Sequence, residues 1–352
     1  GDHRDLHSFP TRRSSDLVLI SGAMFINGLS DVPNAVATCV ATRSLTPKWA
    51  LVLASIFYSL GVILMIFVSS KVAQTIFNIA NFGNDTYYSL IALCSALIGI
   101  VSWSIASWYF GIPSSQSHAL IAGLSGSAIA IHGGFSGINF DEWKKVLIGL
   151  FIVNILAFVL GYLITKFIEI ICKNMDRRKT NIFFEKAQIF GATTTSFMNG
   201  AQDGQKFMAI LLLGILLANG NTQEVSNFSI PIWLTIYCSF LISLGAIIGG
   251  RKIIKTVGTK VTKVEKYQGT AADLSSAICL FTSSIIGIPV SSTHIKNSVV
   301  MGVGASRRIS NVNWTTAKSM ILTWLLTFPC CGMLGYILTK ILLNIKKLIK
   351  IK

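Results

Sequence analysis

A short motif, Phe25-Ile-Asn-Gly-Leu-Ser-Asp31, recurs in the second half of the chain as Phe197-Met-Asn-Gly-Ala-Gln-Asp203. A second motif, GIPSSQSH at residues 111–118, recurs as GIPVSSTH at residues 287–294. The first pair is 172 residues apart (31 to 203) and the second is 176 residues apart (118 to 294). Two different motifs that recur in the same order at nearly the same offset indicate a duplicated structural unit.

The composition between these motifs is that of a membrane protein. Of the 352 residues, 52% are hydrophobic and 12% are charged, whereas soluble domains carry about 25% charged residues. Apolar runs of about 20 residues, the length that spans a bilayer, occur at 17–41, 49–69, 87–110, 146–172, 187–218, 230–250, 270–287 and 314–343. Two further stretches, 112–131 and 289–305, are rich in Gly, Ser and Thr and too polar for lipid-facing helices. We therefore expect an all-α integral membrane protein.

The chain divides into four parts. Residues 1–16 are polar and unlike the rest of the chain, so we expect a non-native N-terminal segment and leave it out of the fold. Residues 17–172 form transmembrane repeat 1, residues 173–186 form a basic cytoplasmic linker, and residues 187–352 form transmembrane repeat 2.

The basic residues set the predicted orientation. The net charge of +16 comes from Lys and Arg in short loops between apolar runs, which the positive-inside rule predicts and which argues against nucleic-acid binding. Loops 173–186 and 251–266 are basic and predicted to be cytoplasmic, whereas loop 219–227 has no Lys or Arg and is predicted to lie outside. Short loops favour a multi-pass protein of a prokaryotic plasma (inner) membrane. The seven cysteines form no CxxC motif, and we assign them no function.

The GIP motifs determine how the halves are related. If each motif is the tip of a re-entrant hairpin, each half crosses the membrane three times and the second half is inverted. Inverted repeats with broken helices at their interface are a recurrent plan of secondary transporters. This arrangement puts the C-terminus outside, although its last residues are rich in Lys.

Asp31 and Asp203 lie inside apolar segments, where an ionisable side chain is a functional candidate. Neighbouring oxygen donors suit a hard cation; they are Asn27, Ser30, Asn34, Asn199, Gln202 and Gln205. The residues Gly28, Pro33, Gly200 and Gly204 are expected to unwind the helices there and free backbone carbonyls. The alternative is structural: each Asp caps a helix end or pairs with Lys206.

The GIP motifs suit an anion. Pro113 and Pro289 are at positions that favour helix starts, and a helix start offers free N–H groups to an oxyanion. The side chains that follow add hydroxyl and amide donors: Ser114, Ser115, Gln116, Ser117, Ser291, Ser292 and Thr293. The alternative is that these residues only cap helices. His118 and His294 are expected to support the site from behind, and Lys206 and Lys296 either add positive charge or pair with an acid.

These four motifs resemble those of the inorganic phosphate transporter (PiT) family, also called the phosphate permease family. The matching segments are 27–38, 111–118, 199–206 and 287–294, and the resemblance extends from about residue 18 to the C-terminus. It implies two inverted repeats, each with a re-entrant hairpin. It also implies a secondary active transporter that moves inorganic phosphate by cation-coupled symport with alternating access.

The resemblance also implies residue roles. Phosphate contacts would come from Ser114, Ser115, Gln116, Gln205, Ser291, Ser292 and Thr293. The coupling cation, sodium at Asp31 and Asp203 or else a proton, would also involve Asn27, Asn34 and Asn199. Ser30 and Gln202 stand where the family has Asn, and Gln116 replaces a hydroxyl residue, so the ion preference stays open.

Alternatives from other classes remain. A sulfate permease of the same family would share the motifs, and an uncoupled anion channel would need no coupling ion. An enzyme is disfavoured because the chain offers no nucleophile–base pair, and no cofactor is expected. The oligomeric state stays open, and a homo-oligomer is compatible with the sequence.

Overall fold

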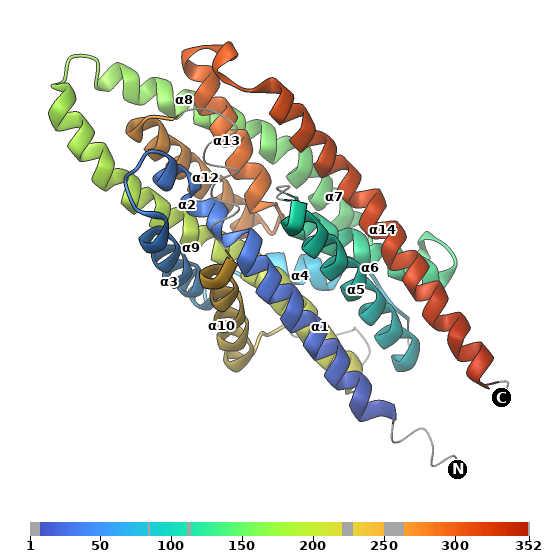
Figure 1. The fold of residues 1–352 in the computed structure, drawn as a ribbon. Coiled ribbons are helices and arrows are strands. Elements are labelled where there is room, and N and C mark those ends of the chain that lie inside the picture. The colour runs from blue at the N-terminus through green and yellow to red at the C-terminus, as the bar shows by residue number, and fades with distance from the viewer. Residues whose placement is uncertain (1–7, 84, 111–113, 220–227, 250–263, 351–352) are drawn as a thin grey trace.

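The computed structural model describes residues 8–350, apart from 84, 111–113, 220–227 and 250–263. This part of the chain is a bundle of helices without a sheet (Figure 1). The helices are α1 (Ser8–Ser30), α2 (Val32–Ala41), α3 (Pro47–Met65), α4 (Lys71–Phe77), α5 (Thr86–Phe110), α6 (Gln116–His132), α7 (Phe140–Ile148), α8 (Asn154–Ile171), α9 (Arg177–Ala218), α10 (Ile232–Gly249), α12 (Lys266–Ile286), α13 (Ser292–Arg307) and α14 (Trp314–Lys350).

The helices confirm the all-α membrane class. Among the described residues, 6 helical segments are long and apolar enough to cross a membrane: α3, α5, α7 with α8, α9, α12 and α14. The outer faces carry exposed apolar side chains such as Ile155, Phe167 and Ile170 on α8. Such faces suit lipid rather than water.

The polar stretches after the GIP motifs are buried, as the sequence predicts. Helices α6 and α13 follow the two motifs, and nearly all of their side chains are buried. Each packs against the helix that precedes its motif, α5 and α12 respectively, so the described residues of each motif lie at the tip of a helical hairpin. Residues 111–113 of the first tip lie outside the described residues.

Each half packs mainly on the other. Helix α1 packs on α10 and α9 packs on α3, while α6 packs on α14 and α13 packs on α8. Glycines at equivalent repeat positions make the close approaches possible, because small residues let membrane helices touch backbone to backbone. A Cβ on Gly28 would lie 2.0 Å from the Ile242 carbonyl oxygen, and one on Gly200 would lie 2.1 Å from that of Tyr58.

The expected unwinding at these glycines is wrong for the second half. Helix α9 runs without a break through Gly200 and Gly204, because both glycines serve the contact with α3 and not a bend. In the first half the chain does break between α1 and α2, at Asp31, one residue before Val32 and two before Pro33. Only this copy of the motif therefore sits at a helix junction.

Two boundaries differ from the sequence expectation. Helix α9 begins at Arg177, capped by the Asp176 side chain, so most of segment 173–186 is helical rather than a linker. Helix α1 begins at Ser8, inside the segment 1–16 that the sequence predicts to be non-native. The start of α1 and the end of α14 lie at the same end of the bundle, away from the turn between α8 and α9 (Figure 1). The loops at 219–227 and 251–266 fall almost entirely outside the described residues.

Candidate functional site

Asp31 is held by a relay of two hydrogen bonds. The Thr293 hydroxyl donates to the Asp31 carboxylate at 2.9 Å, and the Asn34 amide donates to the Thr293 hydroxyl at 2.8 Å. Asp31 precedes the first residue of α2, yet its side chain makes no capping hydrogen bond. The carboxylate, 2% exposed, is therefore free for a role other than capping.

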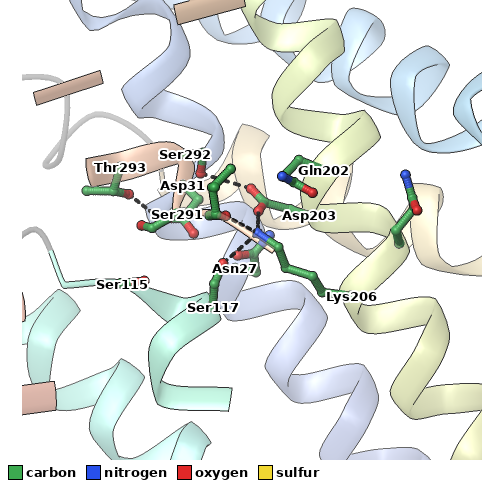
Figure 2. A network of polar contacts seen from close by, with 12 residues as sticks. Asn27, Asp31, Ser115, Ser117, Gln202, Asp203, Lys206, Ser291, Ser292 and Thr293 are labelled. Atoms are coloured by element: carbon green, nitrogen blue, oxygen red, sulfur yellow. Dashed lines mark hydrogen bonds and ion pairs between the residues drawn. The ribbon is translucent and has the colours of Figure 1, made fainter. Parts of the chain in front are cut away.

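Asp203, the equivalent carboxylate of the second half, is held by a similar relay of hydrogen bonds. The Tyr58 hydroxyl donates to Asp203 Oδ2 at 3.2 Å and accepts from the Asn27 amide at 3.1 Å. The Ser292 hydroxyl also donates to Asp203 Oδ2, at 3.0 Å. The tip of the second hairpin thus bonds both carboxylates, through Ser292 to Asp203 and through Thr293 to Asp31 (Figure 2).

The two relays leave amide oxygens without partners. Asn27 and Asn34 use their N–H groups as donors, and their buried Oδ1 atoms accept no hydrogen bond within the described part of the chain. The Asp31 N–H donates to the Asn27 carbonyl one turn earlier at 2.8 Å, and Asn34 shares the Thr293 hydroxyl with Asp31. A carboxylate with two amide oxygens is an oxygen donor set that fits a sodium ion.

Lys206 pairs with Asp203, as the structural alternative predicts. Its ammonium lies 2.7 Å from Asp203 Oδ1 and 2.7 Å from the Ser117 hydroxyl, and it also donates to the Val290 carbonyl. Both partners of the ion pair are 1% exposed. Lys206 thereby joins α9 to both hairpins (Figure 2).

Several predicted phosphate ligands have structural roles in this conformation. Ser115 caps α6 by accepting from the His118 N–H at 3.1 Å, and Ser291 caps α13 by accepting from the His294 N–H at 3.3 Å. Gln116 accepts from the Ser104 hydroxyl on α5. The capping alternative therefore holds for two serines, while Ser114 is buried at the same tip.

Gln205 points away from the two carboxylates. Its Oε1 accepts from the Val72 and Ala73 N–H groups at 3.2 and 3.3 Å, and its Nε2 donates to the Ala201 carbonyl. These contacts satisfy the first turn of α4, whose backbone donors have no partner within their own helix. Asn199 is buried one turn before Asp203, and neither of its amide atoms has a hydrogen-bond partner among the described residues.

The two motif histidines meet in the core. Their rings lie 4.5 Å apart between Phe328 and Trp324 of α14, and Trp324 stacks on His294 at 3.9 Å. No ring nitrogen of either histidine has a hydrogen-bond partner in the described structure. Their contacts in the described structure are therefore ring packing against each other and against α14.

Two participants were missed from the sequence. Tyr58 gave no signal beyond an apolar helix. Asp273 forms a second buried ion pair with Lys296 and accepts from the Thr38 hydroxyl at 2.8 Å. Asp273 stands inside the apolar run 270–287, and the reasoning that singled out Asp31 would have found it.

Comparison with known proteins identifies the family of the chain. Residues 27–335 match the model of the phosphate transporter family. The chain is 38% identical to a "probable low-affinity inorganic phosphate transporter" of Bacillus subtilis (strain 168), over 89% of this chain and 92% of that protein. A protein of Rhizobium meliloti (strain 1021) with the same description is 36% identical, over 88% of this chain and 90% of that protein.

A solved structure shares the fold. It is described as "The sodium-dependent phosphate transporter" and covers 95% of this chain and 100% of its own, with a TM-score of 0.84 and 22% sequence identity. Together with the family match over residues 27–335, these relatives mean that the chain belongs to the phosphate transporter family.

Proposed function

We propose that this protein carries inorganic phosphate across the membrane by symport with sodium, through alternating access to one central site. The observation that carries the proposal is the pair of buried carboxylates, Asp31 and Asp203, held by neighbouring hydroxyls of one hairpin tip. Carboxylates at membrane depth are costly and mark ion pathways. The sodium-dependent relative with the same fold supports sodium as the coupling ion.

Phosphate binds between the hairpin tips, near the first turns of α6 and α13. Each of these helices starts at a capping serine, and the free N–H groups and positive dipole end of a helix start favour an oxyanion. Ser114, Ser292 and Thr293 add hydroxyls on the same tips. In this conformation Ser292 and Thr293 bond the carboxylates, so phosphate entry redirects these hydroxyls and links the anion to the cation site.

Sodium binds at Asp31. The unpartnered amide oxygens of Asn27 and Asn34 supply further ligands without added charge. One bound sodium ion neutralises the carboxylate, and phosphate then enters a site whose repulsion has been removed. By this coupling, we expect each substrate to bind more tightly when the other is present.

The two halves move as inverted repeats in a prokaryotic plasma membrane. Helix α1 of the first half packs on α10 of the second half, and α9 of the second half packs on α3 of the first. This reciprocal packing supports pseudo-symmetry between the halves. The bacterial relatives support the location. We place the basic turn between α8 and α9 in the cytoplasm. The start of α1 and the end of α14, at the other end of the bundle, then lie outside.

Uptake of radiolabelled phosphate into proteoliposomes, with and without an inward sodium gradient at fixed pH, tests the proposal. We expect sodium-driven accumulation that excess sulfate does not suppress. Asp31→Asn should abolish the sodium effect, and Asp141→Asn, at a side chain that is 84% exposed, should retain it. Accumulation that only a pH gradient drives would refute sodium coupling. Uptake of labelled sulfate, or passive currents without accumulation, would refute phosphate symport.

A further inference from the structure

The two halves differ at one position beside their equivalent carboxylates. Asn34 follows Asp31 by three residues, and Lys206 follows Asp203 by three residues, so both pairs keep the offset of 172 residues. The first half therefore offers a neutral amide oxygen where the second half carries an ammonium group. This asymmetry lies at the centre of the repeat.

The oxygens around the Lys206 ammonium are the set that a bound alkali cation would use. They are a carboxylate oxygen of Asp203, a hydroxyl of Ser117 and a backbone carbonyl of Val290. They come from α9, from α6 and from the tip of the second hairpin. Oxygens that converge from separate segments are typical of hard-cation sites.

The ammonium has no donor left for another ligand. A lysine ammonium has three N–H donors, and in this structure three oxygen acceptors take them. Both carboxylate oxygens of Asp203 also accept hydrogen bonds: Oδ1 accepts from Lys206, and Oδ2 accepts from Tyr58 and Ser292. By contrast, the amide oxygens of Asn27 and Asn34 beside Asp31 are buried and unpartnered within the described residues.

We propose that the Lys206 ammonium is a built-in cation that permanently fills the position beside Asp203, so that each transport cycle carries one sodium ion, at Asp31. The inference rests on the proposed symport. In this proposal the Lys206 ammonium takes the place of a second coupling ion. Removing the ammonium should open this position, and the unpartnered Asn199, one turn before Asp203, would add a ligand there.

The test is the ratio of sodium to phosphate carried into the same proteoliposomes, measured with both isotopes for the wild type and for Lys206→Gln. We expect a ratio of 1 for the wild type and 2 for the variant. The Hill coefficient for sodium should rise from about 1 to about 2. Lys206→Arg, which keeps the charge, should stay at 1. Lys296→Gln, which removes the other buried lysine paired with an acid, should also stay at 1.

A binding measurement keeps the test independent of transport. Without phosphate, sodium should raise the thermal stability of Lys206→Gln more than that of the wild type, because a mobile cation then compensates Asp203. In Lys206→Gln/Asp203→Asn this additional stabilisation should vanish. A variant that sodium does not stabilise further, or that keeps a ratio of 1, overturns the proposal.

The outcomes separate this inference from the proposed function. A wild-type ratio of 2 overturns the built-in cation and leaves sodium symport standing. A wild-type protein without sodium-dependent uptake refutes the symport itself. A variant that keeps a ratio of 1 and loses phosphate affinity would instead make Lys206 a phosphate ligand.

Discussion

The ion pair between Asp273 and Lys296 allows a quantitative test of the packing around the site. The two side chains are 0% and 2% exposed, and they bond each other between α12 and α13. Lys296 also donates to the Ala35 carbonyl of α2 at 3.3 Å. In Lys296→Met the carboxylate stays buried without its counter-charge. Removing one partner of a buried pair costs about 3–5 kcal/mol.

Thermal unfolding of the purified protein in detergent measures this cost. At about 2 °C per kcal/mol, the lower value for larger domains, the midpoint of Lys296→Met should fall by about 6–10 °C. The double variant Asp273→Asn/Lys296→Met removes both charges and keeps an amide oxygen for the Thr38 hydroxyl, which donates to Asp273 at 2.8 Å. It should recover most of the loss, because neutral replacement of a buried pair is often near neutral.

The matched control is Lys144→Met. Lys144 pairs with Asp141 at 2.7 Å, but the two side chains are 71% and 84% exposed. Exposed pairs contribute about 0–1 kcal/mol, so its midpoint should stay within about 2 °C of the wild type. If Lys296→Met unfolds like this control, or if the double variant is no more stable than the single one, the reasoning about an uncompensated buried charge is wrong.

Three further variants test other contacts. Gly200→Ala places a Cβ 2.1 Å from the Tyr58 carbonyl oxygen and should destabilise by about 1–3 kcal/mol; Gly22→Ala, with nothing within 4 Å, should be neutral or stabilising in the same thermal assay. Tyr58→Phe removes a donor to Asp203 and should cost about 1.5–3 kcal/mol, and an unchanged midpoint would contradict this relay. Gln205→Ala should speed amide exchange in α4 and leave the phosphate KM unchanged; a large rise in KM would restore Gln205 to the phosphate site.

Much of the fold could be predicted from local pattern. Apolar length predicts the spanning helices, and the Gly, Ser and Thr content of residues 112–131 and 289–305 predicts the buried helices α6 and α13. Helix boundaries were less accessible, because the Asp176 cap extends α9 into a segment whose charges suggested a loop. The role of Gly200 could not be predicted either, since a glycine that permits close packing and one that permits a bend look alike in sequence.

The site was predictable in outline. Two carboxylates in apolar segments and two serine-rich tips can be recognised in the sequence, because polar groups are costly in lipid and therefore rare in spanning segments. The structure joins the second tip to both carboxylates. It also turns Gln205 toward α4 and Gln116 toward α5. The hydrogen-bond partners of these side chains depend on which helices pack against them.

Local patterns are enough to identify a helical membrane protein with two copies of each motif and a carboxylate in each copy of the first motif. Which of these two carboxylates has a charged partner depends on long-range packing. Lys206 is within reach of Asp203 on one helix, but its remaining two acceptors come from Ser117 and Val290, 89 and 84 residues away. Helical periodicity tells which side chains share a face, whereas the groups opposite that face are set by the packing of distant segments.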